Sequence, residues 1–195
     1  MDPSPGLTLA TLFADFGMIL FALILVLLNG FFVAAEFAMV KLRSTRVEAI
    51  ADVNGWRGQI LRTVHSQLDA YLSACQLGIT LASLGLGWVG EPAFAHILEP
   101  LLGAIGVSSP EVIKGVSFFT AFFIISYLHI VVGELAPKSW AIRKPEALSL
   151  WTAVPLYLFY WAMYPAIYLL NASANAILRI AGQGEPGAHH DHAYS

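Results

Sequence analysis

The stretch FGMILFALILVLLNGFFVAAEFAMV, residues 16–40, decides the fold class of this chain. It contains one charged side chain, that of Glu36. A helix needs about 20 predominantly apolar residues to cross the hydrocarbon core of a bilayer. The stretch is longer than that, and it therefore predicts a first membrane-spanning helix over residues 16–40.

The composition of the whole chain places it in the same class. The 195 residues are 57% hydrophobic and 12% charged, with a mean hydropathy of +0.69, whereas soluble proteins are about half apolar and a quarter charged. The net charge is −3 and the basic residues are scattered, which argues against a nucleic-acid-binding surface. Cys75 is the single cysteine, so neither an internal disulfide nor a zinc pattern is expected. We predict an all-α integral membrane protein.

Two further spans and two connecting segments are predicted. Residues 70–89 are apolar and rich in Gly, Ser and Thr, which is typical of closely packed membrane helices. Residues 116–132 are rich in Phe and Ile and predict the third span. The polar stretch 41–69 predicts short juxtamembrane helices broken near Asn54-Gly55. Residues 90–111 contain several Pro and Gly, and we expect a loop with short helices there.

The last apolar stretch, residues 147–181, is too long for one ordinary span. Pro155 and Pro165 interrupt it, and each proline removes a backbone donor and can kink or break a helix. We interpret the stretch as a Pro-broken re-entrant helical hairpin, with a single crossing as the alternative. The composition predicts a membrane domain over residues 1–182 and a linker over residues 183–195.

The distribution of basic residues predicts the orientation. Five Lys or Arg residues follow the first span, one lies between the second and third, and three follow the third. Because cytoplasmic loops carry the excess of Lys and Arg, the N-terminus is expected outside and the ends of the first and third spans inside. Arg179 favours the re-entrant hairpin and therefore a cytoplasmic C-terminus.

The first candidate for a functional site lies within the first span. A carboxylate such as that of Glu36 is costly in lipid and suggests an interior site or an ion pathway. Alternatively, Glu36 reaches the cytoplasmic surface and pairs with Lys41 or Arg43. Asn29 and Gly30 form the second polar feature of this span, where Asn29 could simply hydrogen-bond a neighbouring helix.

The second candidate is a polar stripe on the second span. Steps of three and four residues place its members on one helical face, where they would turn oxygens toward an ion or a partner helix. The members are Ser73, Gln76, Thr80 and Ser83.

The third candidate is the motif GELAPKSW, residues 133–140, at the end of the third span. Gly133 permits close backbone approach, Glu134 supplies a carboxylate, and Pro137 would release carbonyls from helical bonding. Oxygen ligands of this kind suit Mg²⁺ and Na⁺. The alternative is a stop signal, in which Pro137 ends the span and Lys138 fixes the topology. Neither a Ser-His-Asp nor a His-Glu arrangement occurs at workable spacing, so we expect no enzymatic activity.

Three segments together resemble the DUF21 transmembrane domain of the CorC/CNNM family, in its bacterial hemolysin-like branch. The segments are NGFFVAAEFAMVKLR (29–43), LDAYLSACQLGITLASLGLGWVGEPA (68–93) and VVGELAPKSWAIRKPE (131–146). The resemblance implies a magnesium transporter of the bacterial inner membrane that exports Mg²⁺ in exchange for Na⁺. It also implies a homodimer formed through the membrane domain, and three spans with juxtamembrane belt helices. ATP binding in the family belongs to cytoplasmic CBS domains, which are not expected in this chain.

The resemblance also implies which residues contact the ion. Many members have a Ser-Gly pair where this chain has Val33-Ala34, so a contact there would come from backbone carbonyls. The other expected ligands are Glu36, Ser73, Gln76, Thr80, Ser83, Gly133 and Glu134, and the expected positions of helix breaks or gating are Asn29, Gly30 and Pro137. The competing hypothesis is a membrane interaction or regulatory module that transports nothing.

Overall fold

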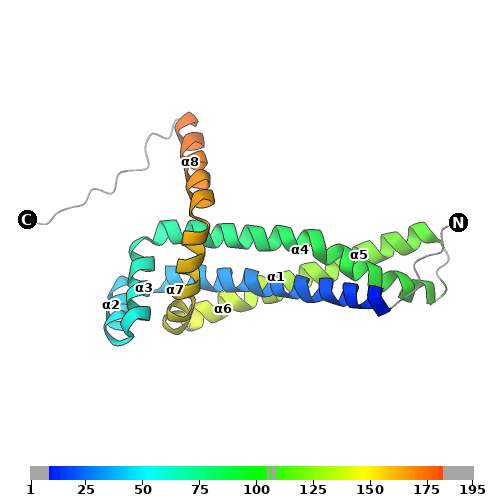
Figure 1. Ribbon diagram of the computed structural model, residues 1–195, viewed down its shortest axis with the longest axis horizontal. Coiled ribbons are helices and arrows are strands. Elements are labelled where there is room, and N and C mark those ends of the chain that lie inside the picture. The colour runs from blue at the N-terminus through cyan, green and yellow to red at the C-terminus, as the bar shows by residue number, and fades with distance from the viewer. Residues whose placement is uncertain (1–8, 105, 107–108, 182–195) are drawn as a thin grey trace, which may run out of the picture.

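The computed structural model describes residues 9–104, 106 and 109–181, and these residues are helical almost throughout (Figure 1). Within them there are eight α-helices and one π-helix, and no strand. The elements are α1 (Leu9–Lys41), α2 (Ser44–Val53), α3 (Gly55–Ser66), α4 (Leu68–Ala104), α5 (Pro110–Leu128), the π-helix η1 (His129–Leu135), α6 (Ala136–Arg143), α7 (Pro145–Ala162) and α8 (Tyr164–Ile180).

Three helical segments are long and apolar enough to cross a membrane. They are Phe16–Lys41, Leu68–Gly90 and Pro110–Arg143, and they run along the long axis of the molecule (Figure 1). Helix α1 packs against α4, η1, α6 and α7, so it is the central helix of the bundle. The three predicted spans are confirmed, and the chain is a multi-pass membrane protein.

The structure corrects the loop predicted for residues 90–111. Helix α4 continues past Gly90 to Ala104. Two prolines, Pro92 and Pro100, lie within this helix and do not end it, because neighbouring residues in a long membrane helix can compensate for the missing donors. The chain turns only at Gly106, whose φ of +91° lies in the left-handed region that favours glycine.

The structure also corrects the helix break expected at Asn29 and Gly30. Helix α1 is uninterrupted from Leu9 to Lys41. The Asn29 side chain bonds to the third span instead of to its own backbone. Gly30 serves close packing, since a Cβ placed there would lie 3.2 Å from Val132 O and 3.0 Å from Pro137 Cγ.

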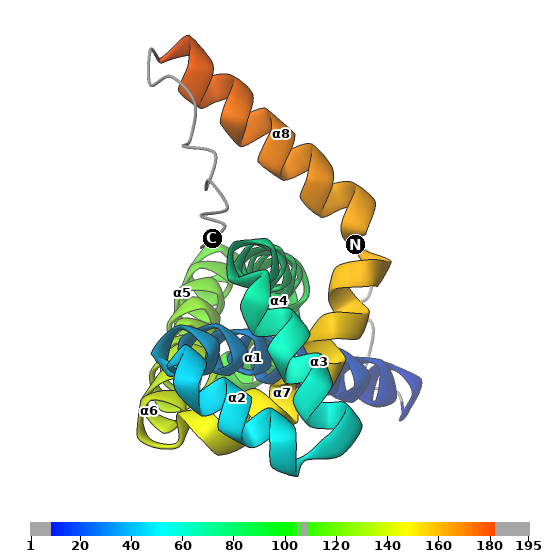
Figure 2. The same cartoon turned by 90° about the vertical axis from the view of Figure 1, so that its left-hand side faces the viewer.

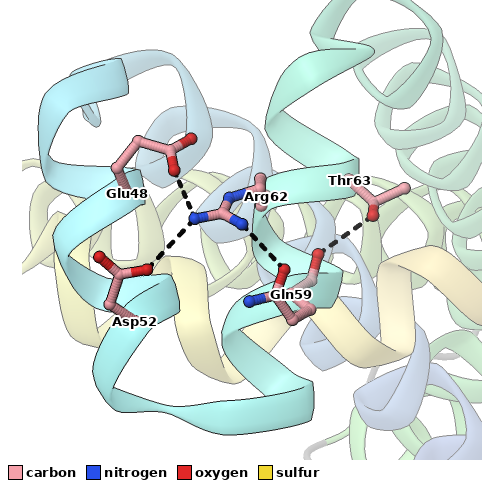
Figure 3. Close-up of polar contacts among 5 residues, drawn as sticks. All are labelled: Glu48, Asp52, Gln59, Arg62 and Thr63. Atoms are coloured by element: carbon pink, nitrogen blue, oxygen red, sulfur yellow. Dashed lines mark hydrogen bonds and ion pairs between the residues drawn. The ribbon is translucent and has the colours of Figure 1, made fainter.

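Helices α2 and α3 form a hairpin at one end of the bundle. The turn falls at Asn54-Gly55, as predicted, and Gly55 has a φ of +54°. The Arg62 guanidinium of α3 joins the two helices by pairing with Glu48 and Asp52 of α2 (Figure 3). Arg62 also donates to Gln59 Oε1 (3.1 Å), and Thr63 donates to the Gln59 carbonyl (3.0 Å).

Helix α7 lies across the bundle (Figure 1). Its Leu156 and Tyr160 pack with Leu61 of α3 and Tyr71 of α4 in the main hydrophobic core. At its N-terminal end, Glu146 accepts two hydrogen bonds from Arg46 of α2, at 2.8 and 2.7 Å. These hydrogen bonds raise the pKa of the Arg46 guanidinium above its ordinary value.

The last apolar stretch is bent at one proline and not at the other. Pro155 lies inside α7 without interrupting it, whereas α7 and α8 meet at 77° at Met163, beside Pro165. Helix α8 extends away from the bundle in both views (Figures 1 and 2). Most of its side chains are therefore exposed on the single chain.

Candidate cation site at the crossing of α1, α4 and η1

The third span contains a π-helical turn at the predicted motif. In η1 the Ala136 N–H bonds Val131 O, five residues back. In a regular α-helix the residue at position 137 would donate to Gly133 O, but Pro137 has no N–H. The π turn accommodates this proline, and the span continues to Arg143. Pro137 therefore does not end the helix, which corrects the break expected there, whereas a role of this residue in gating stays a prediction. Single π turns within α-helices occur frequently at functional sites.

Asn29 of α1 contacts the backbone of η1 at Gly133. Its Nδ2 donates to Gly133 O at 3.0 Å, and the asparagine is 1% exposed. The contact needs glycine at position 133, because a Cβ there would lie 2.9 Å from His129 Cδ2 and 3.3 Å from Asn29 Nδ2. A side chain of the first span therefore contacts the backbone of the third span at this point.

Ser83 of α4 brings the second span to the same point. Its hydroxyl donates to Asn29 Oδ1 at 3.2 Å and lies 3.4 Å from His129 Nε2. The same imidazole nitrogen lies 3.5 Å from Glu134 Oε1. We call Asn29, Ser83, His129, Gly133 and Glu134 the crossing cluster.

The remaining polar residues of the predicted site line a second place, a cavity of about 530 Å³ between α1, α4 and α8. Two residues not predicted from the sequence join them there, Asp69 and Asn171. Ser73 donates to Asn171 Oδ1 at 3.2 Å, and the Thr80 hydroxyl donates to the backbone of its own helix. We call this cavity the outer cavity; its polar lining is Glu36, Asp69, Ser73, Gln76, Thr80 and Asn171.

The predicted ligands therefore lie in two separate places, the crossing cluster and the outer cavity, except for two residues that lie in neither. Val33 and Ala34 are buried in the uninterrupted α1, where their carbonyls serve the helix and their side chains carry no ligand atom. Only Ser83, Gly133 and Glu134 of the predicted ligands lie in the crossing cluster, together with Asn29, which was expected as a break.

The crossing cluster is chemically mixed. It offers a carboxylate, a hydroxyl, an amide oxygen and a backbone carbonyl, which are ligands for hard divalent cations, and one imidazole. In the part of the chain that the structure describes, no group of three or more His, Cys, Asp or Glu side chains could hold a metal ion. A soft site rich in thiolate or imidazole is therefore not found there.

A smaller cavity adjoins the crossing cluster between α4 and α5. Its volume is about 280 Å³, and Ser83, Ser126 and His129 give it a polar lining beside the side chains of Leu86, Phe122 and Ile125. Two members of the crossing cluster are therefore accessible from a cavity within the bundle.

Comparison with known proteins identifies the family. Residues 20–195 match the family described as "Cyclin M transmembrane N-terminal domain". The chain belongs to the CNNM family. The resemblance seen in its three sequence motifs is thereby confirmed.

Relatives of this CNNM chain occur in several bacteria. It is 46% identical to UPF0053 protein YugS of Bacillus subtilis over 82% of this chain and 37% of that protein. UPF0053 protein YrkA of Bacillus subtilis is 46% identical over 91% of this chain and 40% of the relative. Protein Rv1841c of Mycobacterium tuberculosis is 39% identical over 84% of this chain and 46% of that protein. The chain spans less than half of the length of these relatives.

One residue of the CNNM crossing cluster was missed from the sequence, His129. It stands alone in the apolar run of the third span, five positions before Glu134. That separation is not a contact spacing on an α-helix, where neighbours lie three or four residues apart. The π turn of η1 accounts for the contact, and Pro137 within the motif was its one sequence signal.

Proposed function

We propose that this chain is the membrane domain of a Mg²⁺ transporter that exports Mg²⁺ in exchange for Na⁺. The observation that carries the proposal is the crossing cluster, to which all three spans contribute a polar side chain. An ionisable residue inside a membrane segment is costly unless it serves an ion or a partner. Glu134 is such a residue, and its side chain is about half exposed, at 51%.

Ion binding in this proposal exchanges one set of hydrogen bonds for another. In the structure Ser83 donates a hydrogen bond to Asn29, and Asn29 donates one to Gly133 O. A Mg²⁺ ion that binds the oxygens of Ser83, Asn29 and Glu134 would replace the hydrogen bond that the Ser83 hydroxyl now donates to Asn29. Because Asn29 connects α1 to η1, ion occupancy would be transmitted directly to the contact between the first and third spans.

The outer cavity would supply the ion. Glu36 and Asp69 give it two carboxylates, which attract a cation and lower the barrier to leaving bulk water. Thr80 and Ser83 lie one helical turn apart on α4, so the polar stripe of this helix leads from the outer cavity to the crossing cluster. Sodium moving down its gradient would compete for the same oxygens and favour release of Mg²⁺ on the other side.

The orientation and assembly belong to the same proposal. Helices α2, α3 and α6, which carry basic residues in their sequences, lie toward the same end of the bundle (Figure 1), and this end would face the cytoplasm of a bacterial inner membrane. The N-terminus would be outside, and α7 and α8 would dip into the membrane from the cytoplasmic side. The chain would work as a homodimer, with the exposed phenylalanines of α5 as its apolar contact surface.

Flux measurements on this chain in liposomes test the proposal. A trapped magnesium indicator would report Mg²⁺ movement with and without an opposing Na⁺ gradient. We expect flux that requires the gradient and is lost in Glu134→Ala. Glu111→Ala is the matched control, because it removes a carboxylate from the first turn of α5, far along the third span from the crossing cluster.

Two outcomes would contradict the proposal. Flux that is unchanged in folded Glu134→Ala would remove the crossing cluster from the pathway. Silence of the unmodified chain under every gradient would favour the competing hypothesis, a membrane interaction module that transports nothing.

A further inference from the structure

We propose that the crossing cluster binds a divalent transition metal of the Mn²⁺ class more tightly than it binds Mg²⁺, because His129 belongs to it. This inference rests on the proposed function, since it requires the crossing cluster to be a cation site. It deepens that function by naming a second class of cation.

His129 Nε2 lies among the oxygens of the cluster. It is 3.4 Å from Ser83 Oγ and 3.5 Å from Glu134 Oε1. Both separations exceed a good hydrogen bond, which joins the heavy atoms at about 2.7–3.2 Å. The nitrogen therefore lies close to both oxygens without a short bond to either, which leaves it able to accept a cation between them.

The π turn creates this arrangement. His129 and Glu134 lie at opposite ends of the five-residue step that η1 introduces, and Gly133 between them has no side chain to separate the imidazole from Asn29. The imidazole also lines the cavity beside Ser83, with a side-chain exposure of 21%. A cation in that cavity would contact Nε2 as well as the oxygens.

The chemistry of the nitrogen decides between cations. Mg²⁺ prefers oxygen ligands, requires near-ideal octahedral geometry and gives up water reluctantly. Imidazole suits first-row transition metals, and carboxylate and carbonyl oxygens also suit Mn²⁺. A cluster with one imidazole among several oxygens fits Mn²⁺ at every ligand, whereas Mg²⁺ would use the oxygens and gain little from His129.

Equilibrium binding of Mn²⁺ and Mg²⁺ to this chain in detergent tests the inference. Free Mn²⁺ would be measured by electron paramagnetic resonance, and Mg²⁺ affinity by competition. We expect Mn²⁺ to bind at least about tenfold more tightly than Mg²⁺, and His129→Gln to reduce that ratio by about tenfold or more, which is the scale of losing one supporting ligand interaction. Mg²⁺ affinity should change little, because the glutamine offers an amide oxygen.

The matched control is His65→Gln, which removes an imidazole from α3, where His65 Nε2 lies 3.0 Å from the Leu42 carbonyl and outside the crossing cluster. It should leave both affinities unchanged. If His129→Gln does not fold, His129→Asn is the second variant, and the ratio measured for the unmodified chain is itself a test.

The results separate the inference from the proposed function. Mg²⁺ binding with a Mn²⁺ affinity no higher, or with a ratio that His129→Gln does not lower, would overturn the inference and leave the Mg²⁺ proposal standing. Binding of neither cation at the crossing cluster would overturn both.

Discussion

Asn29 is the residue on which the crossing of the three spans depends. It is almost fully buried, donates to Gly133 O and accepts from Ser83. When a buried backbone carbonyl loses its hydrogen-bond donor, the free-energy cost of removing it from water is no longer offset. This one amide therefore connects α1, α4 and η1.

Replacing Asn29 with leucine should destabilise the chain. The change removes the Asn29 hydrogen bonds to Gly133 O and from the Ser83 hydroxyl, and an unsatisfied buried group costs about 1–3 kcal/mol. The melting temperature in detergent would measure the loss. Asn175→Leu is the control, because Asn175 lies on the exposed α8. An equal melting temperature for the two variants would contradict the role assigned to Asn29.

Gly133→Ala should disturb the cluster sterically. The new Cβ would lie 2.9 Å from the His129 ring and 3.3 Å from Asn29 Nδ2, and overpacking of this kind costs about 1–3 kcal/mol. We expect a lower melting temperature and weaker Mg²⁺ binding. Gly115→Ala, where nothing lies within 4 Å, should preserve both; if Gly133→Ala behaves identically, the close contact is unimportant.

At the residue scale, part of the crossing cluster could be predicted from the sequence. Ser83, Gly133 and Glu134 combined polar chemistry with a membrane position, and that combination is conspicuous in an apolar chain. His129 could not be paired with Glu134, because α-helical spacing separates them. The π turn that joins them depends on Pro137 and on the packing of Asn29 against Gly133.

The elements differ from the predicted ones mainly at their ends. The apolar runs located the three spans, because bilayer thickness fixes the length of a spanning helix. They did not show that α4 continues to Ala104 or that the third span continues to Arg143. Each of those segments contains a proline, and a proline in a sequence does not reveal whether neighbouring groups compensate for its missing donor.

The packing of α4 on α1 gives a prediction at this scale. A Cβ at Gly78 would lie 2.5 Å from Cε2 of Phe32, and Phe32 is buried against Phe159, with ring centroids 4.7 Å apart. Gly78→Ala should therefore force the two spans apart and lower the melting temperature, at a cost of about 1–3 kcal/mol.

Gly87→Ala is the matched control for that experiment. It lies on the same helix, and its Cβ would meet nothing within 4 Å. Equal melting temperatures for Gly78→Ala and Gly87→Ala would show that α1 and α4 do not rely on this close approach.

The whole molecule has one basic end, and its orientation in the membrane is testable. Trp56 on α3 and Lys114 on α5 are exposed and belong to opposite ends of the bundle. With a thiol reagent that cannot cross membranes, Lys114→Cys should react in intact cells, whereas Trp56→Cys should react only after permeabilisation. The native Cys75 is buried and should not react with the reagent. The reverse pattern would invert the proposed topology.

The same labelling resolves the bent pair α7 and α8. If the pair enters and leaves the membrane on the cytoplasmic side, Arg179→Cys will react like Trp56→Cys. Reaction in intact cells would instead make the pair a fourth crossing. The sequence could not decide this, because the aromatic and apolar residues of residues 147–181 suit an interfacial helix and a spanning helix equally.

The most direct test of the account concerns where the ion binds, because the structure divides the predicted ligands between two places. Equilibrium Mg²⁺ binding to this chain would be compared in Glu134→Ala and Glu36→Ala, which remove one carboxylate from the crossing cluster and one from the outer cavity. The account predicts that Glu134→Ala abolishes binding, whereas Glu36→Ala retains it. Binding that survives in folded Glu134→Ala and disappears in Glu36→Ala would contradict the account and place the ion in the outer cavity.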